Sequence, residues 1–565
     1  MRIVVDPVTR LSGNFRVSVE LTDGSVTSAN SSGMAYRGFE QMLLKKDPMD
    51  APYFTQRICG MCSSSHATAS VNAIESALEA THLIPGNALL VRNVLNGLGW
   101  IKNHVEHLYM GFLPDLADPT YGDALNASAL GNQLWEELKE RYAVFNGKAY
   151  AEALRCIKLI GRAEGILGGR SPGSPVIVPG GVTVTPSRGD LSALADCAEG
   201  IDAFLQGRLL GAPTVDEWLA GIQAEGFALK YVEGLPMGDL SSWGDLPLYM
   251  MFCSRKLARD TLELPAYIGL DRVGGYSLDD QLIGFLSFGS FYRVRDEAGG
   301  HKDGYSPMED EQANSSEMPA GFTPGGLQSL NAAADRPDPG LIVEHVSASY
   351  YDYNGAKASE TPFNGETAPT KGDIGYDGAR YSFIKAPRYG RVPCEVGPLA
   401  RLINAREKLA MDTMRMLRTS YPPANVYTRV LARMQETLLL SRMLRGWIGD
   451  LDSAGKYCVS LAVRPNVWGS GLIEAPRGAL GHWLRVDGSG RISNYQVVAP
   501  TTWNASPKCS ELKCGPIELA LLGGQTTPFG YLPGSEANPV GLYHTIRSFD
   551  PCIACAVHFI GGKHG

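Results

Sequence analysis

Two Cys-x-x-Cys pairs lie near opposite ends of the chain, Cys59 with Cys62 and Cys552 with Cys555. A histidine follows each pair, His66 after the first and His558 after the second. One such pair alone is typical of either a redox dithiol or half of a zinc site. Four thiolates together suit zinc, nickel or an iron–sulfur cluster, although structural zinc usually draws its pairs from neighbouring stretches. The pattern therefore predicts one metal centre that the fold assembles from both ends of the chain.

The residues around the second pair predict a short helix. Asp550 is a favourable N-cap, and Pro551 suits the first helical position, where its missing N–H costs nothing. A helix beginning there would put Cys552 and Cys555 on one face, with His558 three residues further along. Two thiols and an imidazole on one stripe indicate a metal site.

The composition is that of a globular protein. The residues are 44% hydrophobic and 19% charged, and a chain of 565 residues is long enough to bury a large core. A net charge of −8 argues against nucleic-acid binding, which needs a basic face. Apolar runs fall short of the ~18 residues of a membrane span, and Met1 leads straight into a predicted strand rather than a secretory signal. The eleven cysteines indicate buried thiols rather than a disulfide framework, so we expect a chain made and folded in the cytoplasm.

Hydrophobic periodicity predicts a mostly helical chain. Helical spacing is expected over 65–80, 87–109, 134–144, 149–167, 191–222, 398–421 and 424–446. The last two helices are expected to form an antiparallel pair joined at Pro422 and Pro423. The polar stretch 296–326 is predicted to be an irregular surface loop.

Strand signals are few and local. One hairpin is expected from 15–21 and 25–31, and another within 484–498. We therefore expect an α+β fold, mostly helical, in one large domain spanning 1–565. It would have a central bundle of long helices and small peripheral β-sheets and hairpins, and its N- and C-terminal segments would meet at the metal site.

The segments around the cysteine pairs carry a family resemblance. In chain order they are Asp6-Pro7-Val8-Thr9-Arg10, Arg37-Gly38-Phe39-Glu40, Arg57-Ile58-Cys59-Gly60-Met61-Cys62, Glu395-Val396-Gly397-Pro398-Leu399-Ala400-Arg401, Ala475-Pro476-Arg477-Gly478-Ala479-Leu480-Gly481-His482-Trp483, Thr502-Trp503-Asn504 and Asp550-Pro551-Cys552-Ile553-Ala554-Cys555-Ala556-Val557-His558. With them the chain resembles, from one end to the other, the large catalytic subunit of the nickel–iron hydrogenases. The resemblance implies an oxidoreductase that reversibly splits H2 into protons and electrons.

The resemblance also implies a role for each cysteine. Cys59 and Cys552 would bind nickel terminally, and Cys62 and Cys555 would bridge nickel to iron. The iron would carry carbon monoxide and cyanide ligands. A nickel-bound thiolate keeps a free lone pair, so we expect Cys552 to be the first proton acceptor, with Cys59 as the less favoured choice.

Further site residues follow from the same resemblance. Pro476 and Arg477 would lie over the open metal position, with the guanidinium donating to cyanide. Asp550 would orient Arg477 as well as cap its own helix. His66 would donate to a bridging sulfur. The plainer alternatives are a surface salt bridge for Arg477, a cap alone for Asp550 and an ordinary core histidine for His66.

A magnesium site is also implied by the resemblance. Its ligands would be Glu40, His558 and the backbone carbonyl of Val497. From the residues alone, Glu40 would be a solvated charge.

The chain departs from the family pattern at three positions. Ser12 and Asn14 stand where members commonly carry Glu and His, and that Glu usually starts the proton exit. Protons would therefore leave through a Ser12–water relay or a path led by Arg477 and Asp550. Asn103 stands where an Asp often supports the arginine, which should weaken that clamp.

The electrons need a partner, because no further cysteine cluster is expected to hold iron–sulfur centres. An iron–sulfur small subunit is therefore expected, giving a heterodimer or a larger oligomer, with membrane association only through partners. The enzyme would stay in the cytoplasm or be exported with a signal-bearing small subunit. Residues 559–565 would be either a trimmed tail or a retained one.

Three other functions remain open at this point. One is a hydrogen-sensing regulatory hydrogenase built on the same site. Another is the related quinone-module subunit of respiratory complexes, which lacks the cysteines, so the four cysteines present here argue strongly against it. The third is a zinc-binding structural protein.

Overall fold

The structure is a computed structural model of the whole chain. It describes residues 1–23, 25–276, 283–292, 294, 316–323, 334–353, 357–370, 375–417, 424–511, 513–523 and 539–557. His558 and the tail 559–565 lie outside the described residues, as do Pro422 and Pro423. Within the described part, the fold is α+β and mostly helical, as predicted.

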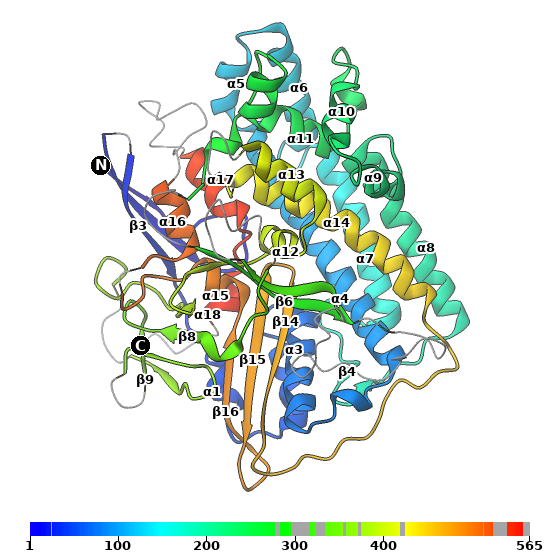
Figure 1. Cartoon of the computed structure of the whole chain (residues 1–565), viewed down its shortest axis with the longest axis vertical. Helices are drawn as coiled ribbons and strands as arrows, with labels where there is room; N and C mark the ends of the chain where they lie inside the picture. Colours follow the sequence, from blue (N-terminus) through cyan, green and yellow to red (C-terminus); the bar gives the residue numbers. More distant parts are fainter. Residues whose placement is uncertain are drawn as a thin grey trace.

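Four long helices form one side of the molecule (Figure 1). They are α4 (Gly86–Glu106), α7 (Lys148–Gly168), α8 (Arg188–Phe204) and α14 (Val426–Gly449). Helix α4 packs on α7 and α14, and α8 packs on α7 and α14. Buried residues recur along one face of α7 at Ala149, Ala153, Cys156, Ile160, Ala163 and Leu167, which is the spacing that fixes an amphipathic helix in a bundle.

Shorter helices surround this bundle. They are α5 (Pro119–Leu125), α6 (Ala129–Tyr142), α9 (Val215–Gly221), α10 (Phe227–Glu233), α11 (Asp245–Cys253), α12 (Pro398–Asn404) and α13 (Lys408–Leu417). Among the described residues, no helix combines the length and the apolar character needed to cross a bilayer.

Two antiparallel three-stranded sheets flank the cysteine pairs. The first runs β1-β2-β3, with strands Arg2–Val5, Phe15–Thr22 and Ser25–Gly33. The second runs β14-β15-β16, with strands Trp468–Ala475, Gly478–Val486 and Ile492–Val498. Both predicted hairpins are confirmed, because β2 pairs with β3 and β15 pairs with β16.

A third sheet joins the bundle to the second one. It has β6 (Gly284–Tyr292) between β7 (Ser316–Thr323) and the two-residue β13 (Cys394–Glu395). Smaller pairings complete the described strands: β8 (Ile342–His345) lies between β10 (Ser359–Glu360) and β12 (Ala386–Tyr389), β9 (Tyr351–Tyr353) pairs with β11 (Thr367–Pro369), and β4 (Ile177–Val178) pairs with β5 (Gly181–Val182).

Helix α3 (Ser63–Ala77) follows the first cysteine pair and lies against β14 and β15. The contact is close because β14 carries Gly469 and Gly471. A Cβ at Gly471 would lie 1.9 Å from the carbonyl oxygen of Ala69, so only glycine admits this approach. The close packing sets α3 directly beside the strand that leads to Arg477.

Three local predictions were wrong. The described part of 296–326, namely 316–323, is a strand that pairs with β6 rather than a loop. The single helix expected over 398–421 is instead α12 and α13, broken where Arg406 takes a left-handed φ of 56°. Cys552 precedes the last helix, because α18 begins only at Ile553.

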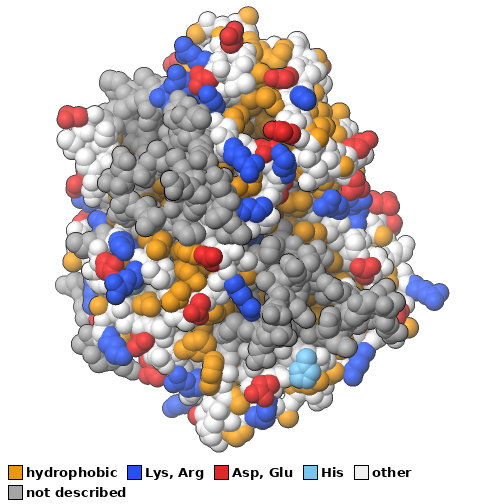
Figure 2. All heavy atoms as spheres, in the orientation of Figure 1, with side chains coloured by type: hydrophobic (Ala, Val, Ile, Leu, Met, Phe, Trp, Pro, Cys, Tyr) orange, Lys and Arg blue, Asp and Glu red, His pale blue; other side chains and the backbone are white. Residues whose placement is uncertain are grey.

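Charges of both signs are interspersed over the surface. Figure 2 shows described Lys and Arg side chains next to Asp and Glu on the face in view. A single-sign basic field of the kind that binds nucleic acid is not seen among the described residues of this face.

Candidate metal centre

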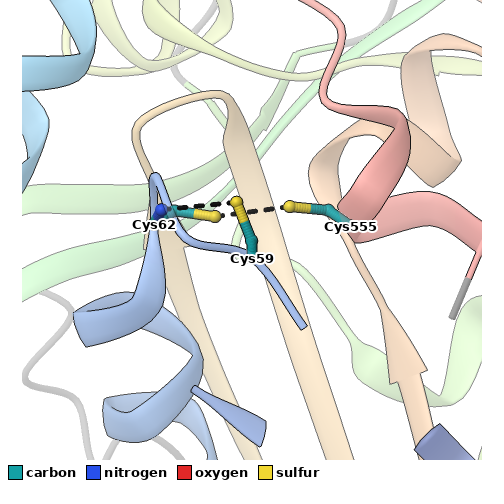
Figure 3. Close-up of side chains that lie close together, drawn as sticks. All are labelled: Cys59, Cys62 and Cys555. Carbon is teal, nitrogen blue, oxygen red and sulfur yellow. Dashed lines mark hydrogen bonds between the residues drawn. The ribbon is translucent and has the colours of Figure 1, made fainter. Parts of the chain in front are cut away.

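The four cysteine sulfurs come together from the two ends of the chain. The Sγ atoms of Cys59 and Cys552 lie 3.4 Å apart, those of Cys62 and Cys555 3.3 Å, and those of Cys552 and Cys555 3.1 Å. All four side chains are buried as free thiols. Figure 3 shows Cys59 and Cys62, on one loop, and Cys555, on a second segment, with their sulfurs pointing toward one another. The predicted meeting of the two pairs is confirmed.

The first pair sits in the turn that enters α3. Cys62 is the residue just before the helix, and Cys59 lies in the loop after α2 (Ala51–Thr55). The backbone N–H groups of Met61 and Cys62 donate to Cys59 Sγ at 3.3 and 3.4 Å. These local hydrogen bonds hold the Cys59 sulfur in place before any distant residue takes part.

The second pair straddles the start of α18 (Ile553–Val557). Cys552 N–H donates to Thr501 Oγ1 at 2.9 Å, and Ile553 N–H donates to the Ser12 carbonyl at 2.7 Å. Asp550 has a left-handed φ of 52°. The prediction that Asp550 caps the last helix was therefore wrong, because the helix begins three residues later.

Arg37 connects the two pairs, and sequence reasoning gave it no role. Its Nη1 donates to the Ala554 carbonyl at 3.0 Å and also to the Ile58 carbonyl. Nη2 donates to the Arg57 carbonyl at 3.1 Å. Ile58 and Ala554 directly precede Cys59 and Cys555, and Arg57 lies two residues before Cys59. Arg37 was visible in a quoted motif, but only the fold shows which backbone groups it reaches.

Arg477 lies in the tight turn between β14 and β15 and is only 3% exposed. Nε donates to the Asp550 carbonyl at 2.8 Å, and Nη2 donates to Asp550 Oδ1 at 3.0 Å. Nη1 donates to Asn103 Oδ1 at 2.6 Å, and Nη2 lies 3.8 Å from Met61 Sδ. The alternative that Arg477 forms an ordinary surface salt bridge is excluded, because its side chain is buried. The guanidinium is instead fixed beside the sulfurs by residues from three segments.

Asn103 retains the supporting position despite being an amide. Its side-chain N–H2 donates to the carbonyls of Met61, at 2.6 Å, and Gly99, at 2.7 Å, which leaves Oδ1 facing Arg477. Asn103 therefore supports Arg477 through a hydrogen bond, as expected at this position, but its amide adds no negative charge.

The electrostatics single out Cys552 among the four thiols. Its pKa is lowered well below the ordinary value, because Cys555, Cys59 and Cys62 donate to it and Arg477 lies close. Burial raises the pKa of Cys555. Burial also opposes the charge on Arg477, but Asp550 and the Cys552 sulfur outweigh it and raise the pKa of Arg477. The site therefore holds negative charge on sulfur next to a permanent cation.

His66 heads a buried hydrogen-bonded chain. His66 Nδ1 lies 3.1 Å from His482 Nε2, and His482 Nδ1 lies 2.8 Å from the Tyr495 hydroxyl, which donates to Ser70 Oγ at 2.9 Å. Both histidines are fully buried. This chain fixes the ring of His66 on α3, and its predicted bond to a bridging sulfur stays a prediction.

In the described part of the expected magnesium site, Glu40 already faces a positively charged side chain, that of Lys385. Glu40 Oε1 accepts from the Val497 N–H at 3.0 Å, and both Glu40 oxygens lie 3.3 Å from Lys385 Nζ. Lys385 also reaches Gln496 Oε1 at 2.9 Å. Glu40 and Val497 meet through the Val497 N–H and not through the predicted carbonyl, and His558 lies outside the described residues. Magnesium stays a prediction.

Ser12 lies next to the second pair through its backbone. It forms an isolated parallel bridge with Cys552 and is partly exposed. Pro476 is also adjacent, since its carbonyl accepts from Arg401 Nη2 at 3.0 Å just before Arg477.

The donor set fits a soft metal centre. Sulfurs ~2.3 Å from one tetrahedral ion would lie ~3.8 Å apart. The three sulfur–sulfur distances of 3.4, 3.3 and 3.1 Å would therefore lengthen by about 0.4 to 0.7 Å around such an ion. Three of the sulfurs, those of Cys59, Cys62 and Cys555, lie within 4.8 Å of one another. Buried thiolates at such distances require a cation to offset their repulsion. The fold and the site therefore define a protein with a buried cluster of four cysteine sulfurs that suits a soft metal ion.

Comparison with known proteins identifies the family. The nickel-dependent hydrogenase family matches residues 37–146 and 280–558, which is more than half of the chain. The chain therefore belongs to the nickel-dependent hydrogenases, as a large subunit of the nickel–iron type, an oxidoreductase acting on H2.

Similar proteins and solved structures support the same family. The uptake hydrogenase large subunit of Rhodobacter capsulatus is 30% identical over 613 residues, covering 100% of this chain and 96% of that protein. The periplasmic [NiFeSe] hydrogenase large subunit of Desulfomicrobium baculatum is 27% identical, with the same coverage. The crystal structure of the reduced, active Ni-Fe-Se hydrogenase from that organism has a TM-score of 0.73 at 26% identity, covering 99% of this chain and 100% of that one.

Proposed function

We propose that the chain is the catalytic subunit of a nickel–iron hydrogenase that splits H2 heterolytically and reversibly. The observation that carries the proposal is the convergence of four buried sulfurs from residues 59–62 and 552–555. The bound centre would supply a Lewis acid that polarises H2 and an electron acceptor. The site residues would supply the base, the orientation and a dry cavity.

Cys59 and Cys552 would be the terminal nickel ligands, and Cys62 and Cys555 would bridge to an iron carrying carbon monoxide and cyanide. Cys552 Sγ is the proposed first proton acceptor, supported by its lowered pKa and by the adjacent Arg477. Cys59, the other terminal ligand, is the alternative proton acceptor.

Arg477 would orient and stabilise ligands at the open metal position. Its guanidinium is locked by Asp550 and Asn103, which leaves it little freedom to rotate away. Such fixed donors act strongly in a water-excluded site, because no reorganisation is needed when charge develops. His66 would support a bridging sulfur from the other side. Glu40, Val497 and His558 would hold magnesium.

An iron–sulfur small subunit would take the electrons away. The names of the relatives, as large subunits and large chains, support such a partner. The only group of three or more Cys, His, Asp or Glu side chains close enough to hold a metal, in the part of the chain that the structure describes, is the cysteine cluster itself. Through this partner the chain would also form any larger oligomer and any association with a membrane. It would stay in the cytoplasm or be exported with a signal-bearing small subunit.

The proposal is tested on the co-purified complex. Elemental analysis should find nickel and iron in equal amounts, and infrared spectra should show carbon monoxide and cyanide bands. Oxidation of H2 with an artificial electron acceptor should proceed at ordinary enzymatic rates. Zinc in place of nickel would overturn the proposal. Nickel and iron with only very slow turnover would favour the hydrogen-sensing alternative.

A further inference from the structure

Arg401 is a buried arginine on α12 that the proposed function does not use. Its side chain is only about 1% exposed, and all five of its N–H groups donate hydrogen bonds. Nε and Nη2 donate to the two carboxylate oxygens of Glu436, each at 2.7 Å, and Nη1 donates to Glu474 Oε2 at 2.6 Å. The remaining two N–H groups donate to the carbonyls of Ala475 and Pro476, each at 3.0 Å. Arg401 therefore fixes two carboxylates and two backbone carbonyls relative to one another.

The two carbonyls belong to the residues directly before Arg477. Pro476 and Arg477 form the two-residue turn between β14 and β15, so Arg401 holds the backbone at the start of this turn. Gly478 follows the turn and lies against the residues that lead into α12. A Cβ at Gly478 would lie 2.6 Å from the Gly397 backbone nitrogen, and its φ of 128° also favours glycine. The segment around the start of α12 thus holds the turn on both sides of Arg477.

Segment 395–401 is itself attached to α14 at both of its ends. Glu395 accepts from Nε and Nη2 of Arg429, each at 3.0 Å, and Arg401 binds Glu436 in the same two-bond manner. Such paired hydrogen bonds fix orientation as well as distance. Burial opposes the charge on Glu436, but Arg401 outweighs it and lowers the pKa of that carboxyl to about 2, so the pair stays ionised. The long helix α14 therefore determines where the segment lies.

One face of α4 contacts both arginines. The guanidinium carbon of Arg401 lies 4.4 Å from the centre of the Trp100 ring, which is the arrangement of a cation–π contact. Asn103, three residues later, accepts from Arg477 Nη1 at 2.6 Å. Residues three apart on a helix lie on the same face. Helix α4 therefore places the two guanidinium groups relative to each other.

We propose that Arg401 is a positioning residue for Arg477. It holds the turn that carries Arg477 and so sets where that guanidinium lies beside the cysteine sulfurs. The inference rests on the proposed hydrogenase function, in which Arg477 acts at the open metal position. Arg401 acts through the backbone of Ala475 and Pro476 and not on the reacting atoms. Its effect is large because a displacement of about 1 Å near the reacting groups lowers a rate by up to ~10²-fold.

The test compares Arg401→Lys with wild type in the intact complex, with rates expressed per nickel. Lysine keeps the positive charge, but its single ammonium cannot bind both glutamates and both carbonyls. We expect kcat to fall roughly 10- to 100-fold as Arg477 shifts. KM for H2 should stay unchanged, because Arg477 is expected to act as charge develops rather than on H2 binding. The infrared bands of cyanide should shift, since they report the donor that faces it.

A double variant separates positioning from a general loss of stability. If Arg401 acts through Arg477, Arg401→Lys should lower kcat no further once Arg477→Lys is present, so the two losses are not additive. A contribution that is only structural would lower kcat by the same factor in both backgrounds. That additive result would overturn the proposal.

Arg92→Lys is the matched control. Arg92 on α4 is fully buried, donates to both Glu75 carboxylate oxygens at 3.0 and 2.7 Å, and donates to the carbonyls of Val178 and Gly181. Its substitution should lower stability toward denaturant, as Arg401→Lys does, while kcat per nickel and the infrared bands stay unchanged. Equal losses of kcat in the two variants would contradict a specific role of Arg401.

Glu436→Gln provides a second variant in case Arg401→Lys does not yield a complex. It weakens the attachment of Arg401 to α14, so kcat and the infrared bands should change in the same direction but less. If neither variant binds nickel while Arg92→Lys does, the pair serves only folding, and the positioning role is wrong.

Two further outcomes separate the positioning role from the function. An unchanged kcat in Arg401→Lys, in a complex whose wild type splits H2, would overturn the positioning role and leave the hydrogenase function intact. A wild-type complex that contains nickel and iron but does not split H2 would overturn the proposed function. Crystal structures of wild type and Arg401→Lys would then still show whether the turn with Arg477 moves, and an unmoved Arg477 would refute the inference.

Discussion

The first cysteine pair enters α3, a helix of 15 residues, whereas the second pair straddles the start of α18, which has only five. Cys59 is stabilised by backbone N–H groups two and three residues away. Cys552 depends on Thr501 and, through Ile553, on Ser12, which lie about 50 and 540 residues away in the sequence. The two halves of one metal centre are thus held by local and by distant contacts, respectively.

The unequal lengths of α3 and α18 affect how the metal centre forms during folding. A five-residue helix has little stability of its own, so α18 takes its place only when the sheets and α3 have formed. The first pair can adopt its turn as soon as α3 packs on β14. We therefore expect the second pair to be the more sensitive half, and four variants test this, from the largest effect to the smallest.

Loss of a thiolate should have the largest effect. Cys552→Ser removes the proposed proton acceptor and a metal ligand, so H2 oxidation should fall below detection and the nickel content should drop. The measurement is elemental analysis together with an H2-oxidation assay. Cys458→Ser is the matched control, because Cys458 is exposed and lies outside the centre. Full nickel and activity in Cys552→Ser would contradict the assigned site.

Arg477→Lys should reduce the rate without emptying the site. Lysine carries the charge but does not contact Asn103 and Asp550 at the same time, so the two halves lose their common clamp. We expect kcat to fall roughly 10²-fold, as when one fixed donor is removed from an active site, with nickel and iron retained. Arg491→Lys, at an exposed ion pair with Asp47, serves as the control. A wild-type kcat in Arg477→Lys would show that the clamp geometry is dispensable.

Arg37→Lys tests the connection between the two pairs. The guanidinium donates to carbonyls next to both pairs, and lysine does not span them. Nickel should be lost to a chelator roughly 10- to 100-fold more readily, the range found when a group supporting a metal ligand is removed. The loss should be followed as nickel release over time, in parallel with wild type. Equal release rates would mean that the two halves are held independently.

Thr501→Val should have the smallest effect and acts on the second pair alone. It leaves the buried Cys552 N–H without its acceptor, which costs about 1–3 kcal/mol. Thr502→Val is a close control, since Thr502 Oγ1 is buried and has no hydrogen-bond partner among the residues that the structure describes. Denaturant unfolding of both variants should show a loss of stability for the first only. Equal stability would argue that Ser12 and Arg37 suffice to hold the second pair.

The sequence predicted the elements whose signals are local. The helices α3, α4, α7 and α14 and the two hairpins follow from apolar spacing and turn residues, which act over a few positions. The break between α12 and α13 was missed because a single left-handed residue, Arg406, interrupts an otherwise regular apolar pattern. The strand at 316–323 was missed because it lies within the polar stretch 296–326 and contains a proline and a glycine, and its pairing is supplied by β6.

The sequence by itself identified the two thiol pairs as candidate ligands, because the pairs and their flanking motifs can be recognised without coordinates. Tertiary structure alone decided how they are supported: the hydrogen bonds of Arg37 to both pairs, the Thr501 acceptor and the chain from His66 to Ser70. The physical reason is that ligand chemistry belongs to residue types, whereas hydrogen bonds and charge interactions depend on which distant segments the packed core brings within a few ångströms.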